Sequence, residues 1–138
     1  MTNKQIILVQ ESWQIVKPIA DIAAQNFYDK LFQRAPGIRH LFKGDIKQQA
    51  QKLAAMLGFV VRELHRIEDI VDDVKNLGAR HKHYGAKPAH YDLVGVCLLE
   101  TLSEGLGEKW NQELEMAWST AYNILKDAMI GAMEAEPA

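Results

Sequence analysis

A histidine lies in line with an apolar helical stripe near the middle of the chain. Ile70, Val74 and Leu77 follow one another at spacings of four and three residues, and His81 comes four residues later. Residues at these spacings share one face of an α-helix, so His81 is expected to face the same way as the apolar residues before it. A histidine on a buried face needs a partner there, and a bound metal is one way to supply it.

A second polar residue begins the apolar stripe of the preceding helix. That stripe consists of Gln49, Leu53, Met56, Val60 and Leu64. A buried amide without hydrogen-bond partners costs about 1–3 kcal/mol. The connection between the two helices is short, near residues 65–68, so the faces that carry Gln49 and His81 can oppose each other. A flat ligand between these faces would use both polar side chains.

Composition and net charge indicate the number of domains and the kinds of partner to expect. The chain has 138 residues, 48% of them hydrophobic, and a net charge of −2, which suits one domain and gives no reason to expect nucleic acid or an anionic membrane as a partner. The single cysteine, Cys97, excludes an internal disulfide and suits a reducing compartment, so a cytoplasmic location is expected. We find no signal peptide and no apolar run long enough for a membrane span.

Helical periodicity dominates the whole chain, and strand-like alternation is weak, which predicts an all-α fold. Breaks are indicated by Pro18, Pro36-Gly37, Gly44, Gly78, Gly85 with Pro88, and Gly107. The expected helices cover about 3–17, 18–35, a short segment to Leu41-Phe42, 46–65, a helix ending near Tyr84, 88–106 and 108–133. The last two should pack antiparallel, because only Gly107 separates them.

The ordered set of motifs resembles a globin, in particular bacterial single-domain haemoglobins, flavohaemoglobin haem domains and neuroglobin. The motifs, spread between Gln10 and Met129, are ESW, FYDKLF, Pro36 followed by HLF, QAQKL, LGARHKHYG, HYDLVG and AWSTAYNIL. The resemblance implies a globin fold of about seven to eight helices in a three-over-three sandwich around a pocket for haem b. The globin domain is expected to cover residues 1–134, with a short tail at 135–138.

The resemblance places His81 at the position of the iron ligand. Its neutral imidazole would bind the metal through one nitrogen, while the other donates to a backbone carbonyl one turn earlier, near Leu77. His83 is the competing candidate, but two residues along a helix turn it to roughly the opposite side. The remaining histidines are expected at the surface or as structural hydrogen-bonding residues: His40, His65 and His90.

Tyr28 and Gln49 correspond to the distal side of a globin pocket. A phenol hydroxyl and an amide N–H can both donate to bound O2, which is partly negative, and each bond to a charged group contributes about 1.5–3 kcal/mol. Two such bonds would tighten O2 binding about a hundredfold or more, and would favour O2 over CO. The alternative is that the Tyr28 hydroxyl points elsewhere and Gln49 reaches solvent. No histidine occupies the distal position, and the ferric form could take Tyr28 or water as a sixth ligand.

Other residues would complete the pocket. The resemblance implies that Phe42 packs on the porphyrin face, and that the pocket is lined by Leu53, Leu77 and Val94. Lys52 and Arg80 would pair with the haem propionates, or else lie as solvated surface charges.

Tyr91, ten residues after His81, matches a tyrosine of flavohaemoglobins and related bacterial globins. The resemblance implies that this tyrosine and a carboxylate late in the last helix form hydrogen bonds around the proximal histidine. That carboxylate does not align, because Met133 falls at the expected position and Glu134 comes one residue later.

The resemblance implies a haem protein that reversibly binds O2 and other diatomic gases, as a carrier, store or scavenger, without a catalytic cycle of its own. NO dioxygenation is the first alternative and would need a separate reductase, because no GxGxxG motif follows a strand. Two other alternative functions are a gas sensor that acts through a partner and a haem-free helical scaffold. We expect a monomer or weak dimer.

Overall fold

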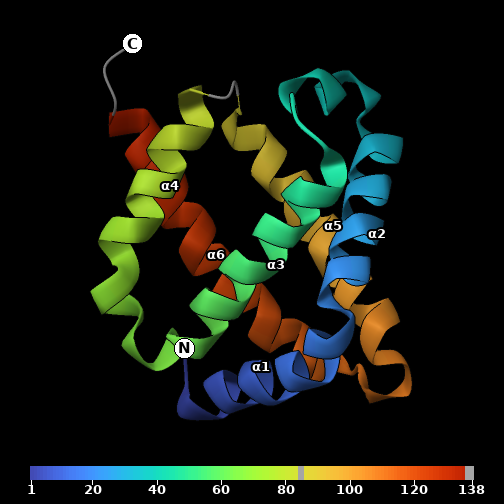
Figure 1. Ribbon diagram of the computed structural model, residues 1–138. Coiled ribbons are helices and arrows are strands. Elements are labelled where there is room, and N and C mark those ends of the chain that lie inside the picture. The colour runs from blue at the N-terminus through green and yellow to red at the C-terminus, as the bar shows by residue number, and fades with distance from the viewer. Residues whose placement is uncertain (84–85, 136–138) are drawn as a thin grey trace.

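The computed structural model describes residues 1–83 and 86–135, and within these ranges it contains helices and connecting turns without a strand (Figure 1). The predicted all-α class is therefore confirmed. The α-helices are α1 (Asn3–Val16), α2 (Ala20–Arg34), α3 (Ile46–Arg62), α4 (Val71–His83), α5 (Pro88–Leu106) and α6 (Gln112–Ala135). Short 3-10 segments connect them: η1 (Lys17–Ile19), η2 (Pro36–Leu41), η3 (Leu64–Ile70) and η4 (Gly107–Lys109).

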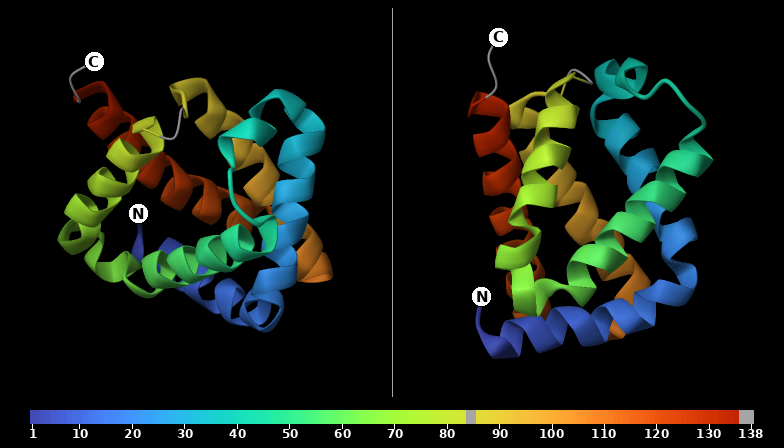
Figure 2. Two further views of the ribbon diagram at one scale, coloured as in Figure 1. Left: turned by 45° about the horizontal axis from the view of Figure 1, so that its top comes forward. Right: turned by 60° about the vertical axis from the view of Figure 1, so that its left-hand side comes forward.

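The helices pack across one another. Helix α6 contacts α1, α4 and α5, and α1 also contacts α5. Helix α2 packs on α3 and on α5. The crossing of the helices is visible in Figure 2. In the parts that the structure describes, no helix has an apolar stretch that would reach across a bilayer.

Helices α3 and α4 diverge from their connection η3 and lie on opposite sides of the space in front of α6 (Figures 1 and 2). Gln49 lies in the first turn of α3 and His81 in the last turn of α4, so both lie at the end of their helix that is remote from η3. The expectation that the faces of Gln49 and His81 oppose each other stays a prediction.

Several helix ends are fixed by local hydrogen bonds. Thr2 and Gln5 form a reciprocal capping box at the start of α1, and the Asp45 side chain accepts from the Lys47 N–H at the start of α3. Asn111 likewise accepts from the Leu114 N–H before α6. At the other end of α5, Gly107 has φ +56°, a conformation that glycine adopts without steric cost. The predicted break at Gly107 is confirmed, and α6 returns toward the end of the molecule where α5 begins (Figure 1).

Some predicted boundaries were wrong by a few residues. The second helix begins at Ala20 instead of Pro18, because Ile19 leaves the helical region with φ −114° and ψ 16°. Helix α3 ends at Arg62 instead of His65, and the segment after it contains a non-helical residue, Arg66. The last helix begins at Gln112 instead of Glu108, after the short turn η4. Tyr84, near the predicted end of the fourth long helix, lies outside the described residues.

Gly78 was one of the indicated breaks, but the helix expected to end near Tyr84 contains it, and the structure confirms that this helix continues through Gly78. Gly78 lies inside α4, where a Cβ atom would come within 2.6 Å of the Met129 carbonyl oxygen and 2.7 Å of its Cα on α6. Glycine is needed because the two backbones approach too closely for any side chain. The contact fixes α4 on α6 one turn before His81.

The core contains a polar contact that joins α1 to α6. The Trp118 indole N–H donates to the Ser12 hydroxyl oxygen at 2.9 Å, and the Ser12 hydroxyl lies 2.7 Å from the Leu8 carbonyl. Trp13 packs on Trp118 with ring centroids 6.3 Å apart. Both buried tryptophans are therefore packing residues of the core.

Candidate functional site

The His81 ring is oriented by a hydrogen bond to its own helix. Its Nδ1 lies 2.7 Å from the Leu77 carbonyl oxygen, which is the predicted contact one turn earlier. A carbonyl can only accept, so Nδ1 carries the proton and the lone pair lies on Nε2. The bond therefore selects the tautomer in which Nε2 is the nitrogen able to bind a metal.

The surroundings of His81 keep its imidazole neutral. Burial lowers its pKa below the ordinary value; the hydrogen bond to Leu77 opposes this effect, and the nearby charge of Arg80 adds to it. A neutral imidazole is the form that binds a metal, because protonation of both nitrogens removes the lone pair. The tautomer selected by the hydrogen bond and the lowered pKa of His81 are thus both suited to binding a metal.

Tyr28 and Gln49 are brought together by the crossing of α2 and α3. The Gln49 side-chain amide donates to the Tyr28 hydroxyl oxygen at 3.3 Å, a long hydrogen bond. Tyr28 is buried, and burial raises the pKa of its phenol, while the bond from Gln49 partly opposes that shift. The Tyr28 hydroxyl is therefore protonated at neutral pH, and its own hydrogen can be donated to another acceptor.

An aromatic cluster surrounds Tyr28. Its ring packs edge-on against Phe42 with centroids 5.4 Å apart, and stacks on Phe32 at 5.9 Å. Phe32 and Phe42 also contact each other edge to face at 5.3 Å. Phe42 therefore lies beside the Tyr28–Gln49 pair.

The predicted pocket-lining residues are half-buried. They are Phe42 after η2, Leu53 on α3, Leu77 on α4 and Val94 on α5. Each also packs against the hydrophobic core. Large apolar side chains that remain partly accessible are able to line a ligand site.

Lys52 and Arg80 are exposed, and neither forms an ion pair with a carboxylate of the described residues. Their pairing with propionates stays a prediction.

The side chain of Tyr91 is buried on α5, and burial raises the pKa of its phenol. Its backbone carbonyl accepts from the Tyr122 hydroxyl at 2.7 Å, which ties α5 to α6. Gly95 makes room for this contact, because a Cβ there would lie 2.9 Å from Cε2 of the Tyr122 ring. The proposed carboxylate partner is not tested, since the side chains of Met133 and Glu134 lie outside the part described.

The other histidines lie as predicted where the structure describes them. His40 and His65 are exposed, and Nδ1 of His90 accepts from the Lys87 N–H at 3.0 Å. The side chain of His83 lies outside the described part, so its predicted orientation is not tested.

Two further residues lie near the site. Phe32 follows Tyr28 by four residues, and this i, i+4 spacing indicates a contact between the two rings. Arg39 comes three residues before Phe42, and no local sequence pattern indicates its role. Its guanidinium lies over the Phe32 ring, 5.2 Å from the centroid, and donates to the Phe42 carbonyl oxygen at 2.8 Å.

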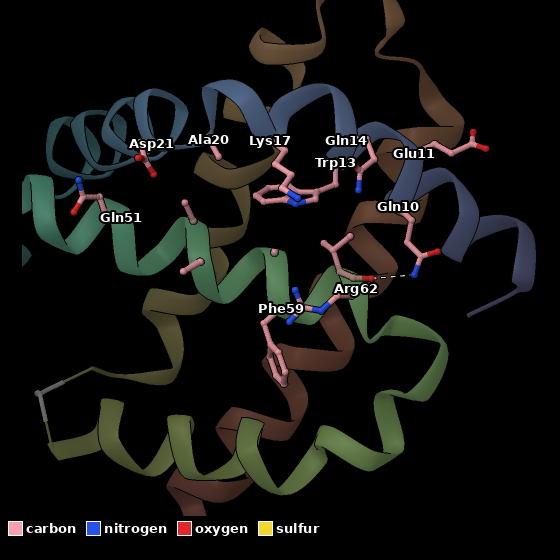
Figure 3. A pocket seen from close by; sticks show the side chains of 14 residues that line it. Gln10, Glu11, Trp13, Gln14, Lys17, Ala20, Asp21, Gln51, Phe59 and Arg62 are labelled. Carbon is pink, nitrogen blue, oxygen red and sulfur yellow. Dashed lines mark hydrogen bonds between the residues drawn. The ribbon is translucent and has the colours of Figure 1, made fainter.

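A groove lies elsewhere, between α1 and α3 (Figure 3). It has a volume of about 610 Å³, and its walls include Trp13, Gln14, Gln51, Gly58 and Phe59. The amide of Gln10 closes one side by donating to the Val61 carbonyl at 3.1 Å. None of the predicted site residues lines this groove.

Comparison with known proteins identifies the class. The family model described as Globin matches residues 25–129, and on this evidence the chain belongs to the globin family. An anaerobic nitrite reductase of Arabidopsis thaliana is 33% identical over 98% of this chain and 95% of its own length. The flavohemoprotein of Bacillus subtilis (strain 168) is 28% identical over 95% of this chain, which spans only 34% of that protein.

A solved structure shares the same fold. It is an engineered carbene transferase named for a nitric oxide dioxygenase of Rhodothermus marinus, with a TM-score of 0.88 and 25% identity over 97% of this chain and 94% of that one. The predicted all-α globin fold is confirmed.

Membership of this family implies haem binding, and the residues present fit that group. The donor set combines a neutral, oriented imidazole on α4 with a protonated phenol on α2 and an amide near the start of α3. Half-buried apolar side chains on α3, α4 and α5 suit the faces of a flat macrocycle.

Proposed function

We propose that this globin holds haem b between α3 and α4, with His81 as the iron ligand, and that it binds O2 reversibly on the side of Tyr28 and Gln49. The observation that carries the proposal is the donor pair Tyr28–Gln49, in which the amide donates to the phenol oxygen. A haem iron supplies a centre at which O2, CO and NO can bind and be released. The chain's own residues then determine which ligand is retained.

Tyr28 is the principal donor in this proposal. Because its oxygen already accepts from Gln49, its hydroxyl hydrogen is directed away from the amide. The aromatic rings of Phe32 and Phe42 exclude water around it, which strengthens a hydrogen bond to a partly charged ligand. Gln49 contributes mainly by orienting the phenol.

The Tyr28→Phe variant tests the proposal. We expect the O2 dissociation rate of the ferrous protein to rise about tenfold or more, since a hydrogen bond to a charged group is worth about 1.5–3 kcal/mol. CO carries little charge, so its dissociation rate should change much less and serves as the internal control. An unchanged O2 dissociation rate would show that Tyr28 is not the donor.

Enzymatic turnover is a second candidate, favoured by the names of the relatives, which include a flavohemoprotein and anaerobic nitrite reductases. In NO dioxygenation, NO, O2 and one electron yield nitrate, so the globin would need a separate reductase as electron donor. Nitrate formation over many cycles, with and without added reductase, separates turnover from a single reaction. Turnover that persists without reductant would contradict this candidate.

A further inference from the structure

Arg39 contacts the segment that carries Phe42 in two ways. Its backbone carbonyl accepts from the Phe42 N–H at 3.1 Å, and its guanidinium donates to the Phe42 carbonyl at 2.8 Å. Phe42 itself has an extended backbone, with φ −102° and ψ 101°, where the chain leaves η2. Arg39 therefore holds both peptide groups of Phe42 at a point without regular secondary structure.

The same guanidinium reaches the aromatic cluster. It lies 5.2 Å from the centroid of Phe32, within the range of a cation–π contact. Phe32 contacts both Tyr28 and Phe42, and Tyr28 contacts Phe42. Arg39 thus contacts the ring of Phe32 and the backbone of Phe42, and the rings of both residues contact Tyr28.

Arg39 forms no ion pair with any carboxylate of the described residues, although Arg34 in the preceding helix pairs with Glu100. An exposed arginine serving only solubility would point into solvent or pair with an acidic neighbour. Here the planar guanidinium of Arg39 contacts the Phe42 carbonyl and the Phe32 ring at the same time. A lysine ammonium would reproduce these two contacts only in part.

From these contacts we infer that Arg39 is a positioning residue of the distal site: it fixes Phe42 and Phe32, and through them the direction of the Tyr28 hydroxyl. The inference deepens the proposed function and rests on it for the effect on ligand release.

The test compares Arg39→Gln, Arg39→Lys and a matched control, Arg62→Gln, in the haem-loaded protein. Arg62 lies over the Phe59 ring at 5.7 Å, near the other end of α3, and is not connected to Tyr28 by any contact that the structure shows. We expect Arg39→Gln to raise the O2 dissociation rate about threefold to tenfold, from the loss of one cation–π contact and one hydrogen bond. Arg39→Lys should restore part of the effect, and Arg62→Gln should change nothing.

Two spectroscopic readouts separate positioning from general destabilisation. The C–O stretching frequency of the CO complex and the NMR ring resonances of Phe42 and Tyr28 should move in Arg39→Gln, but not in Arg62→Gln. Unfolding curves recorded beside them show how much stability each variant has lost. Unchanged resonances and unchanged rates in Arg39→Gln would overturn the inference.

Combining Arg39→Gln with Tyr28→Phe distinguishes the inference from the proposed function. If Arg39 acts through Tyr28, its substitution has no further effect on O2 release in the Tyr28→Phe background. An equal effect in both backgrounds overturns the route through Tyr28. If Tyr28→Phe alone leaves O2 release unchanged while Arg39→Gln still moves the rings, the donor role of Tyr28 fails and the positioning of the cluster by Arg39 is upheld.

Discussion

Two of the polar contacts that join helices in this protein differ in how completely their hydrogen-bonding groups are satisfied. Between α1 and α6, the Trp118 N–H donates to Ser12 at 2.9 Å, and the Ser12 hydroxyl is itself within 2.7 Å of a backbone carbonyl. Between α2 and α3, Gln49 donates to Tyr28 at 3.3 Å, and the Tyr28 hydrogen is available to another acceptor. The first contact satisfies its groups inside the protein and stabilises the fold, whereas the second leaves the phenol hydrogen that the proposed function assigns to a ligand.

This difference predicts that substitutions in the two regions affect different quantities. Changes in the packing of α1 on α6 should lower the free energy of unfolding and leave ligand release unaltered. Changes in the distal pair should alter ligand release and leave the free energy of unfolding nearly unchanged.

The largest effect on stability is expected for Gly78→Ala. Alanine in a helix is favoured over glycine by about 1 kcal/mol, but the new Cβ would lie 2.6 Å from a backbone oxygen of α6, and overpacking costs about 1–3 kcal/mol or more. We expect a net loss, measured by urea unfolding. Gly131→Ala is the matched control, because nothing lies within 4 Å of a Cβ at that position of α6, and it should be neutral or stabilising.

Trp118→Phe should destabilise the protein by about 1–2 kcal/mol, because it removes the donor to Ser12 and leaves a small cavity. Its O2 dissociation rate should stay within about twofold of the wild-type value, as expected for a site that it does not touch. Trp110→Phe, at a half-buried position, is the control for the loss of an indole. A large change in ligand release in Trp118→Phe would break the division between the two regions.

Gln49→Leu should raise the O2 dissociation rate by about threefold, less than Tyr28→Phe, because a neutral hydrogen bond contributes about 0.5–1.5 kcal/mol and here acts through the phenol. Gln51→Leu, on the exposed side of α3, controls for the loss of an amide. If Gln49→Leu exceeded Tyr28→Phe in effect, Gln49 would be the principal donor and the order of roles would be reversed.

The smallest effect concerns alkaline pH. Burial raises the pKa of both Tyr28 and Tyr122 above the ordinary value of 10.0. The unfolded chain therefore releases these protons first, so the stabilisation is complete below pH 10 and declines as the pH rises through the folded-state values. Urea unfolding between about pH 9 and 12 should show this decline, and Tyr122→Phe should reduce it by about 1 kcal/mol or less. An identical decline in the variant would exclude Tyr122 as a contributor.

The sequence predicted those parts of the fold and site that depend on local spacing. The contact between His81 and Leu77 follows from the four-residue repeat of one helix, and Tyr28 and Phe32 share a face for the same reason. The break at Gly107 was also predictable, because a positive φ favours glycine.

Features that depend on how distant segments cross were not predictable in this way. Gly78 is a close-approach residue only because α6 passes at Met129, and without that path it resembled a break. The direction of the Gln49–Tyr28 bond needed the crossing of α2 and α3, and the contact of Arg39 with Phe32 needed the turn of η2. Helix starts shifted by a few residues where short 3-10 turns replaced the first helical turn.

The central claim, that the imidazole on α4 binds the haem iron, is tested most directly by the absorption spectrum of a His81→Gly variant loaded with haem. The account predicts that the variant loses the axial signature of the wild-type ferrous and CO forms and regains it when free imidazole is added. A His81→Gly protein that takes up haem with an unaltered axial spectrum, with or without imidazole, would contradict the account.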